Sequence, residues 1–273
     1  MESNARLKNI HYTSHENLPE QSPMLSENDM DKIIEEYFTK NDQLESMAKI
    51  GVGAFGTVIK VKDRNDNRIY ALKITTSKGR SNECKILADL DHPCIVKYYN
   101  SRLYSDKWLV IQMGYCEMTL KLVIENKNAI LKRHVGNKYI ELFDYIISWQ
   151  IYWEIVSVLR YLHHHAKVLH LDIKPSNILC DPNLSHGTLI KIADFGLSIK
   201  YEDISHTYTD KCKGSPGYMA DENERGKYTP ASDVFSFGQT MAHLFNVDMD
   251  LEYHIVDYEQ PSLLKKQIHN MLD

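Results

Sequence analysis

The side chains best suited to chemistry lie in two short segments of the second half of the chain. One segment reads H-L-D-I-K-P-S-N-I-L over residues 170–179, and the other reads D-F-G over residues 194–196. The polar positions Asp172, Lys174 and Asn177 adjoin two apolar runs and have little structural reason to be there. One carboxylate can orient an attacking hydroxyl, while a second carboxylate and an amide oxygen are hard ligands that suit magnesium on phosphates. The two segments therefore favour phosphoryl transfer.

Three of the twelve glycines, Gly51, Gly53 and Gly56, fall within one six-residue window. The spacing G-x-G-x-x-G alone is a weak signal, because a dinucleotide site needs a helix directly after it. Residues 57–62 instead alternate and include β-branched side chains, so we expect a hairpin. The main chain of such a hairpin can approach a triphosphate closely, because glycine has no side chain. A glycine-rich turn without a ligand is the alternative.

Lys73 is a single charge among apolar neighbours in the sequence A-L-K-I. A buried lysine is costly unless it is paired. Phosphate oxygens would pair with it, and so would Glu83, ten residues further on. A surface lysine on an edge strand is the alternative.

These residues need elements that bring them together. We expect strands at residues 47–50, 57–62, 68–74, 95–100 and 108–113, and a helix at 83–90. Residues 141–163 and 234–245 are apolar enough to predict buried helices. The predicted fold class is α+β, with a small β-rich part followed by a larger helical part. The connection between the two is tight and falls near residues 114–117.

The first 43 residues differ from the rest. Residues 1–28 hold only eight apolar residues and predict a flexible tail. Residues 29–43 predict a short amphipathic helix and a linker, with Met30, Ile33, Ile34, Tyr37 and Phe38 on one face. We expect this face to pack on the following domain, and a partner or homodimer face is the alternative.

Composition excludes several classes of protein. The 273 residues are 43% apolar, which excludes a disordered chain, and the net charge of −5 provides no positive field for nucleic acid or anionic lipid. We therefore expect neither nucleic acid nor a membrane as a partner. The five cysteines are scattered and odd in number, which argues against a disulfide framework. No targeting block is visible, so we expect a cytoplasmic protein, with the nucleus left open.

The order of these motifs resembles that of the eukaryotic-type protein kinase superfamily. Glycine-rich hairpin, strand lysine, helix glutamate, H-x-D loop and D-F-G are followed by G-S-P-G-Y-M-A-D-E at 214–222, and the resemblance covers roughly residues 44–245. It implies a bilobal fold in which 44–113 form the amino-terminal lobe, 114–117 the hinge and 118–273 the carboxyl-terminal lobe. ATP and Mg²⁺ are the implied cofactors.

The resemblance also implies a role for individual residues. It assigns nucleotide binding to Gly51, Gly53, Gly56, Val58, Ala71, Lys73, Glu83, Met113, Cys116 and Leu179. The implied catalytic residues are Asp172, which accepts the proton of the incoming hydroxyl, Lys174, which contacts the transferring phosphate, and Lys73. Asn177 and Asp194 would bind magnesium. Asp233 matches an aspartate that braces the catalytic loop, and His170 and Phe195 match members of a packed column.

Softer signals concern the acceptor. Residues 111–120, I-Q-M-G-Y-C-E-M-T-L, resemble kinases of the alpha subunit of translation initiation factor 2, and H-L-D-I-K-P-S-N resembles the Wee-type kinases as well. The implied partner is a protein substrate of one of these kinds, or a cell-cycle protein. Lys174 and Ser215 favour a Ser/Thr acceptor, and a Wee-type tyrosine-directed kinase is the alternative.

Departures from the family pattern support a further alternative. Leu171 replaces the usual arginine of H-R-D, so we expect activity to depend only weakly on phosphorylation of Thr207, Tyr208 or Thr209. Asp221 replaces the proline of A-P-E, and we expect the carboxyl-terminal lobe to be incomplete at its end. The alternative is a catalytically silent kinase-fold regulator.

Overall fold

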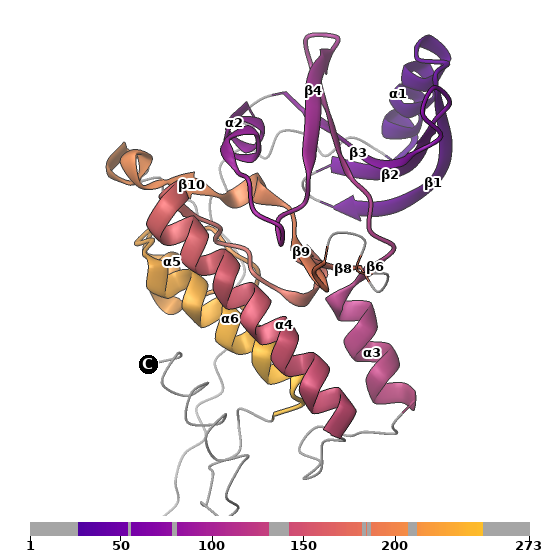
Figure 1. The fold of residues 1–273 in the computed structure, drawn as a ribbon. Coiled ribbons are helices and arrows are strands. Elements are labelled where there is room, and N and C mark those ends of the chain that lie inside the picture. Colours follow the sequence, from indigo (N-terminus) through magenta and orange to yellow (C-terminus); the bar gives the residue numbers. More distant parts are fainter. Residues whose placement is uncertain are drawn as a thin grey trace, which may run out of the picture.

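The computed structural model describes residues 27–53, 56–77, 81–130, 142–181, 184, 187–206 and 212–247. A five-stranded sheet forms the first part and helices dominate the second (Figure 1). This confirms the predicted α+β fold class. Most of the predicted tail, and residues 248–273 of the predicted carboxyl-terminal lobe, lie outside the described residues.

The sheet is antiparallel throughout and has the strand order β1-β2-β3-β5-β4. Its strands are β1 (Leu44–Gly53), β2 (Gly56–Asp63), β3 (Ile69–Thr76), β4 (Tyr98–Tyr104) and β5 (Trp108–Gly114). At Gly56 the backbone φ is 113°, and a Cβ there would lie 2.3 Å from the carbonyl oxygen of Ile74. The position therefore requires glycine.

The expected strand at 95–100 is wrong in its boundaries, because β4 begins only at Tyr98. Ile95 instead forms a parallel bridge with Ile192, and Val96 donates a backbone hydrogen bond of 2.9 Å to the carbonyl oxygen of Ile192. Ile95 and Val96 are buried. The apolar run therefore continues into the core of the second part before the sheet begins.

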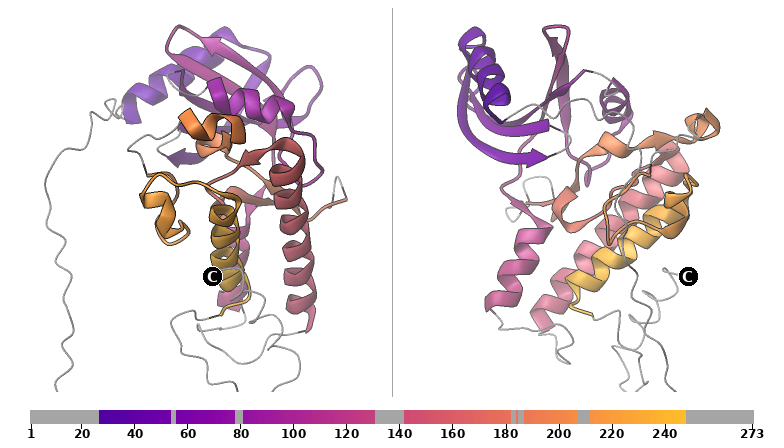
Figure 2. Two further views of the ribbon diagram at one scale, coloured as in Figure 1. Left: turned by 90° about the vertical axis from the view of Figure 1, so that its left-hand side faces the viewer. Right: turned by 180° about the vertical axis from the view of Figure 1, so that it is seen from behind.

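The two faces of the sheet are buried by different elements, as the alternation of side chains along a strand requires. Trp108 and Val110 of β5 share a cluster with Tyr37 of helix α1 (Glu27–Lys40). Ile111 and Met113 share another cluster with residues of helix α2 (Ser81–Asp89). Helices α1 and α2 thus lie on opposite sides of the sheet (Figure 2).

The second part is built around two long helices that lie side by side (Figure 1). Its helices are α3 (Leu120–Ile130), α4 (Leu142–Arg160), α5 (Asp221–Glu224) and α6 (Pro230–Leu244). Its short strands are β6 (Met118–Thr119), β7 (Val168–Leu169), β8 (Ile178–Cys180), β9 (Ile190–Ile192) and β10 (Ile199–Lys200). Helix α4 continues into a π-helical turn, Tyr161–Ala166.

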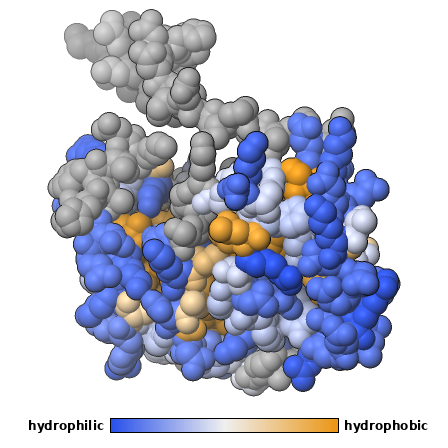
Figure 3. All heavy atoms as spheres, turned by 90° about the horizontal axis from the view of Figure 1, so that it is seen from above, coloured by the Kyte–Doolittle hydropathy of each residue, from blue (hydrophilic) through white to orange (hydrophobic). Residues whose placement is uncertain are grey.

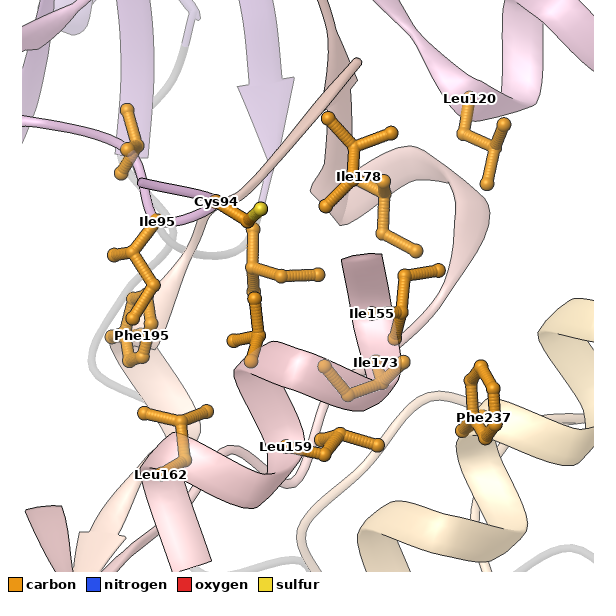
Figure 4. Packing of buried hydrophobic residues seen from close by; sticks show 14 of the residues in the cluster. Cys94, Ile95, Leu120, Ile155, Leu159, Leu162, Ile173, Ile178, Phe195 and Phe237 are labelled. Atoms are coloured by element: carbon orange, nitrogen blue, oxygen red, sulfur yellow. The ribbon is translucent and has the colours of Figure 1, made fainter. Parts of the chain in front are cut away.

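The main hydrophobic core joins the two parts. Ile155 of α4, Phe237 of α6 and Phe195 are buried in the same cluster as Ile111 and Met113 of the sheet. Figure 4 shows Phe195 beside Leu162, with Phe237 on the opposite side of the cluster. Seen from above, the surface is mostly hydrophilic with small apolar groups (Figure 3). Among the described residues no helix combines the length and apolarity needed to cross a bilayer.

A buried carboxylate fixes the start of β9. Glu154 on α4 is 8% exposed and accepts backbone hydrogen bonds from Leu189 at 2.9 Å and from Ile190 at 3.0 Å. Asp181 donates a backbone bond of 2.8 Å to the carbonyl oxygen of Leu189. The segment between β8 and β9 is therefore held to α4 at its second end, and its first end is bonded to the second.

Tyr37 provides a test of how α1 is attached. It is fully buried, its ring centroid lies 5.2 Å from that of Tyr104, and its hydroxyl has no hydrogen-bond partner among the described residues. Tyr37→Ala should lower the free energy of unfolding by about 3–5 kcal/mol, because a large cavity replaces the ring. Tyr37→Phe should match or exceed the wild type, because the removed hydroxyl is unpaired. Denaturant unfolding of both variants measures this, and equal losses would contradict it.

Candidate active site

Lys73 lies on β3, a central strand, and is 4% exposed. Its Nζ lies 2.6 Å from Oε1 of Glu83 in the first turn of α2, and 2.8 Å from Oδ1 of Asp194. The alternative of a surface lysine on an edge strand is therefore wrong. Two carboxylates compensate the buried ammonium, whose desolvation would otherwise be costly.

Asp194 is held in the left-handed region, with φ 61°. Burial raises the pKa of its carboxyl, but the charge and hydrogen bond of Lys73 outweigh burial, and the pKa lies below its ordinary value. Asp194 is therefore a carboxylate at neutral pH.

Asp172 is 2% exposed and held by three side chains. Asn177 Nδ2 donates to its Oδ2 at 2.8 Å, and Lys174 Nζ donates to the same oxygen at 2.8 Å. Ser215 Oγ donates to Oδ1 at 2.6 Å. Sequence reasoning noted Ser215 for acceptor preference but missed this contact, because the two residues are 43 positions apart. The carboxylate is thus fixed in one orientation with both oxygens engaged.

His170 joins the H-L-D segment to the D-F-G segment. The backbone N–H of Asp172 donates to His170 Nδ1 at 3.2 Å, so Nδ1 is an acceptor. Nε2 then carries the proton and donates to the carbonyl oxygen of Ala193 at 3.1 Å. The ring of His170 lies 4.7 Å from that of Phe195. The imidazole thus links the loop of Asp172 to the residue before Asp194.

Asp233 on α6 is fully buried beneath the same loop. It accepts backbone hydrogen bonds from His170 at 2.9 Å and Leu171 at 2.7 Å. His163 Nε2 lies 2.8 Å from its Oδ2. Sequence reasoning missed His163, because the run of three histidines at 163–165 gives no sign of which one is buried. Leu171 has φ 64°, a strained conformation that these bonds stabilise.

The residues assigned to the nucleotide lie on the α2-facing side of the sheet and beyond its end. Strand register places Val58 beside Lys73, and Ala71 beside Met113. Gly51 pairs with Val58 and Gly53 with Gly56, so these glycines form the end of the β1–β2 hairpin. Leu179 lies on β8, and Cys116 in the link between β5 and β6. Burial raises the pKa of the Cys116 thiol to about 11, so it is neutral at pH 7.

The donor set suits magnesium. Asn177 turns its amide nitrogen toward Asp172, so its carbonyl oxygen points the other way. Asp194 contributes a second hard oxygen donor. No cluster of three or more metal-ligating side chains occurs in the part of the chain that the structure describes. Two protein ligands completed by phosphate oxygens and water are typical of magnesium sites.

Leu171 lies where an arginine is usual in the family that the sequence resembles. It is 1% exposed and packs with Leu169, Ile199 and Tyr228. Leu197, Tyr201 and Ile204 border this apolar cluster. Apolar packing therefore ties the loop of Asp172 to the segment after D-F-G.

The chain is similar in sequence to a family of known proteins. The model of the family described as "Protein kinase domain" matches residues 44–270. The interferon-induced, double-stranded RNA-activated protein kinase of Rattus norvegicus is 30% identical, over 80% of this chain and 44% of its own length. The probable serine/threonine-protein kinase nek2 of Dictyostelium discoideum is 33% identical, over 72% and 47%.

A third relative has a different acceptor in its name. The membrane-associated tyrosine- and threonine-specific cdc2-inhibitory kinase wee-1.3 of Caenorhabditis briggsae is 29% identical, over 70% of this chain and 27% of its own length. The chain thus spans less than half the length of these curated relatives.

Replacing Lys73 with methionine tests the buried ion pairs. Two carboxylates are left without their cation, which should cost about 3–5 kcal/mol of unfolding free energy at neutral pH. Lys73 keeps the pKa of Asp194 below its ordinary value of 3.8, so this contribution is complete above that pH and is lost as the pH falls through the lowered pKa. In the variant, burial raises the pKa of Asp194, so the buried carboxyl takes up a proton as the pH falls. Denaturant unfolding from pH 7 downward should therefore show the difference in unfolding free energy from wild type narrowing as the pH falls. A difference that stays constant would contradict the pairing.

Leu171 leads to a prediction about regulation. Since it offers packing rather than a guanidinium, a phosphate on Thr207, Tyr208 or Thr209 has one fewer charged partner. These three residues lie outside the described part of the chain. Phosphatase treatment of the protein should leave its rate of phosphoryl transfer largely unchanged. The rate is measured on the same preparation with and without the treatment. Loss of turnover after treatment would show the prediction to be wrong.

Proposed function

The chain belongs to the protein kinase family, and from that premise we propose that it transfers the γ-phosphoryl group of ATP to Ser or Thr hydroxyls of a protein. One observation carries the proposal: Asp172 is held by Lys174, Asn177 and Ser215, while Lys73 is paired with a carboxylate on each side. A silent kinase-fold regulator would not need a carboxylate that is oriented so fully. These contacts support the proposal at two places, the loop of Asp172 and the surroundings of Lys73.

Phosphoryl transfer needs positioning and charge neutralisation more than covalent work. We assign proton acceptance from the incoming hydroxyl to the Asp172 carboxylate. Lys174, within 2.8 Å of Asp172, would place its positive charge beside the phosphoryl group in transit. Asn177 and Asp194 would hold Mg²⁺, which when bound neutralises phosphate charge. Lys73, kept in place by Glu83, would hold the phosphate oxygens of ATP.

A hollow beside Lys174 supports a protein substrate. It has a volume of about 350 Å³ and is lined by residues of α3, of the Asp172 loop and of α6, together with Tyr218. The Tyr218 hydroxyl lies 2.6 Å from Nδ1 of His243 on its wall. We propose that the chain segment next to the acceptor residue lies in this hollow. Residues 111–120 favour a substrate that resembles the alpha subunit of translation initiation factor 2.

Tyrosine phosphorylation is the second candidate, because of the segment H-L-D-I-K-P-S-N, although its Lys174 favours a Ser/Thr acceptor. This segment resembles the Wee-type kinases, and the relative named as tyrosine- and threonine-specific supports it. The Lys174–Ser215 contact of 2.5 Å beside Asp172 supports the Ser/Thr assignment instead.

The transfer of label from γ-labelled Mg-ATP to a general protein acceptor tests the proposal. Asp172→Ala should lower the rate by a factor on the order of 10²–10⁴, because the proton acceptor is lost. Lys73→Met should also lose activity, whereas Lys62→Met, a control for charge removal on β2, should keep it. Phosphoamino-acid analysis of the product separates Ser/Thr from Tyr. Equal labelling by all four proteins would overturn the enzyme assignment.

A further inference from the structure

Lys60 faces the side of the sheet to which nucleotide binding is assigned. Thr57, Ile59 and Val61 of β2 are buried, and the last two belong to the cluster under α1, so Val58 and Lys60 point to the opposite face. The register pairs Lys60 with Ala71. Lys60 therefore lies in the next position along β2, on the face that carries Val58 and Ala71, two of the residues assigned to nucleotide binding.

Tyr115 lies directly after Gly114, the last residue of β5, and before β6 begins at Met118. Residues 115–117 thus form the link by which the chain passes from the sheet into the second part of the molecule. Both Tyr115 and Lys60 are half-buried. The link is therefore within reach of a long side chain that projects from β2.

The two residues form a cation–π contact. Lys60 Nζ lies 4.4 Å from the centroid of the Tyr115 ring, well within the range of this interaction. Within the described ranges Lys60 has no carboxylate at ion-pair distance. The Tyr115 ring is thus the partner that the structure gives to the half-buried Lys60 cation.

We infer that Lys60 and Tyr115 are positioning residues that brace β2 against the link and so keep the base-binding face closed on the nucleotide. The inference rests on the proposed function, since it concerns the ATP site. β2 continues from the glycine hairpin, so a fixed point at Lys60 limits the movement of the hairpin relative to the link. A site that is ordered before binding loses less entropy when the nucleotide enters.

The pair predicts a pattern of nucleotide affinities. Lys60→Met should weaken binding of Mg-ATP about three- to ten-fold, the range of a partly buried cation–π contact. It should raise KM for ATP much more than it lowers kcat, because neither residue touches the reacting atoms. Tyr115→Leu should lose as much affinity, whereas Tyr115→Phe and Lys60→Arg should retain it, because ring and cation remain. The double variant Lys60→Met with Tyr115→Leu should lose no more than either single variant.

Calorimetric titration of the whole chain with Mg-ATP, together with KM and kcat, decides the question. Lys62→Met, two residues along the same face of β2, is the matched control and should bind as the wild type does. Failure of the wild type to bind Mg-ATP would overturn the proposed function. If the wild type binds Mg-ATP and Lys60→Met binds it with unchanged affinity, the positioning role of Lys60 and Tyr115 is overturned and the proposed function is not. Additive losses of affinity in the double variant would have the same meaning. If Lys60→Met fails to fold, the comparison of Tyr115→Leu with Tyr115→Phe decides: equal affinities overturn the brace, and loss in the leucine variant alone supports it.

Discussion

The relative placement of the two parts of the molecule depends on the buried ammonium group of Lys73. Lys73 lies inside the protein between Glu83 and Asp194, and neither carboxylate comes from its own strand. Helix α2 must therefore pack on the sheet, and the D-F-G segment must reach up from the second part, before the charge is compensated. The main hydrophobic core also requires the two parts to be in contact, because Ile111 and Met113 of the sheet are buried in it together with residues of α4 and α6. Charge pairing and apolar packing thus require the same relative placement of the two parts.

A second buried charge organises the loop below. Asp233 accepts hydrogen bonds from the backbone N–H groups of His170 and Leu171, and in the described part of the chain His163 is the basic side chain beside it. Those bonds hold the positive φ of Leu171, and the turn that results directs Asp172 toward Lys174, Asn177 and Ser215. The substitution at 171 leaves this framework intact, because the bonds use the main chain. Its side chain instead adds apolar contact with the following segment.

Much of the fold and part of the site are predictable from the sequence, each for a physical reason. The alternation of apolar residues predicts the strands, and the cost of burying Lys73 predicts a carboxylate partner such as Glu83. The expected strand at 95–100 begins three residues before β4, since apolar residues in a bridge to β9 have the same sequence pattern as residues in a sheet. The contacts of Ser215, His163 and Lys60 depend on tertiary placement, and no local spacing encodes them. The roles of individual residues in nucleotide binding, catalysis and magnesium binding come from the resemblance to the protein kinase family, because spacing and geometry alone do not assign them.

The carboxylate of Glu154 has a consequence for engineering. It accepts hydrogen bonds from the backbone N–H groups of Leu189 and Ile190, while the backbone N–H of Asp181 donates to the carbonyl oxygen of Leu189. The strand that leads to Asp194 is therefore anchored at its start by α4, and Thr188 adds a hydrogen bond of 2.9 Å from Lys191 Nζ. Foreign sequence grafted between residues 181 and 187, such as an epitope or a fluorescent reporter, should therefore leave the position of Asp194 unchanged. The same anchoring would allow the connection between Asp181 and β9 to vary in length among related proteins without displacing Asp194.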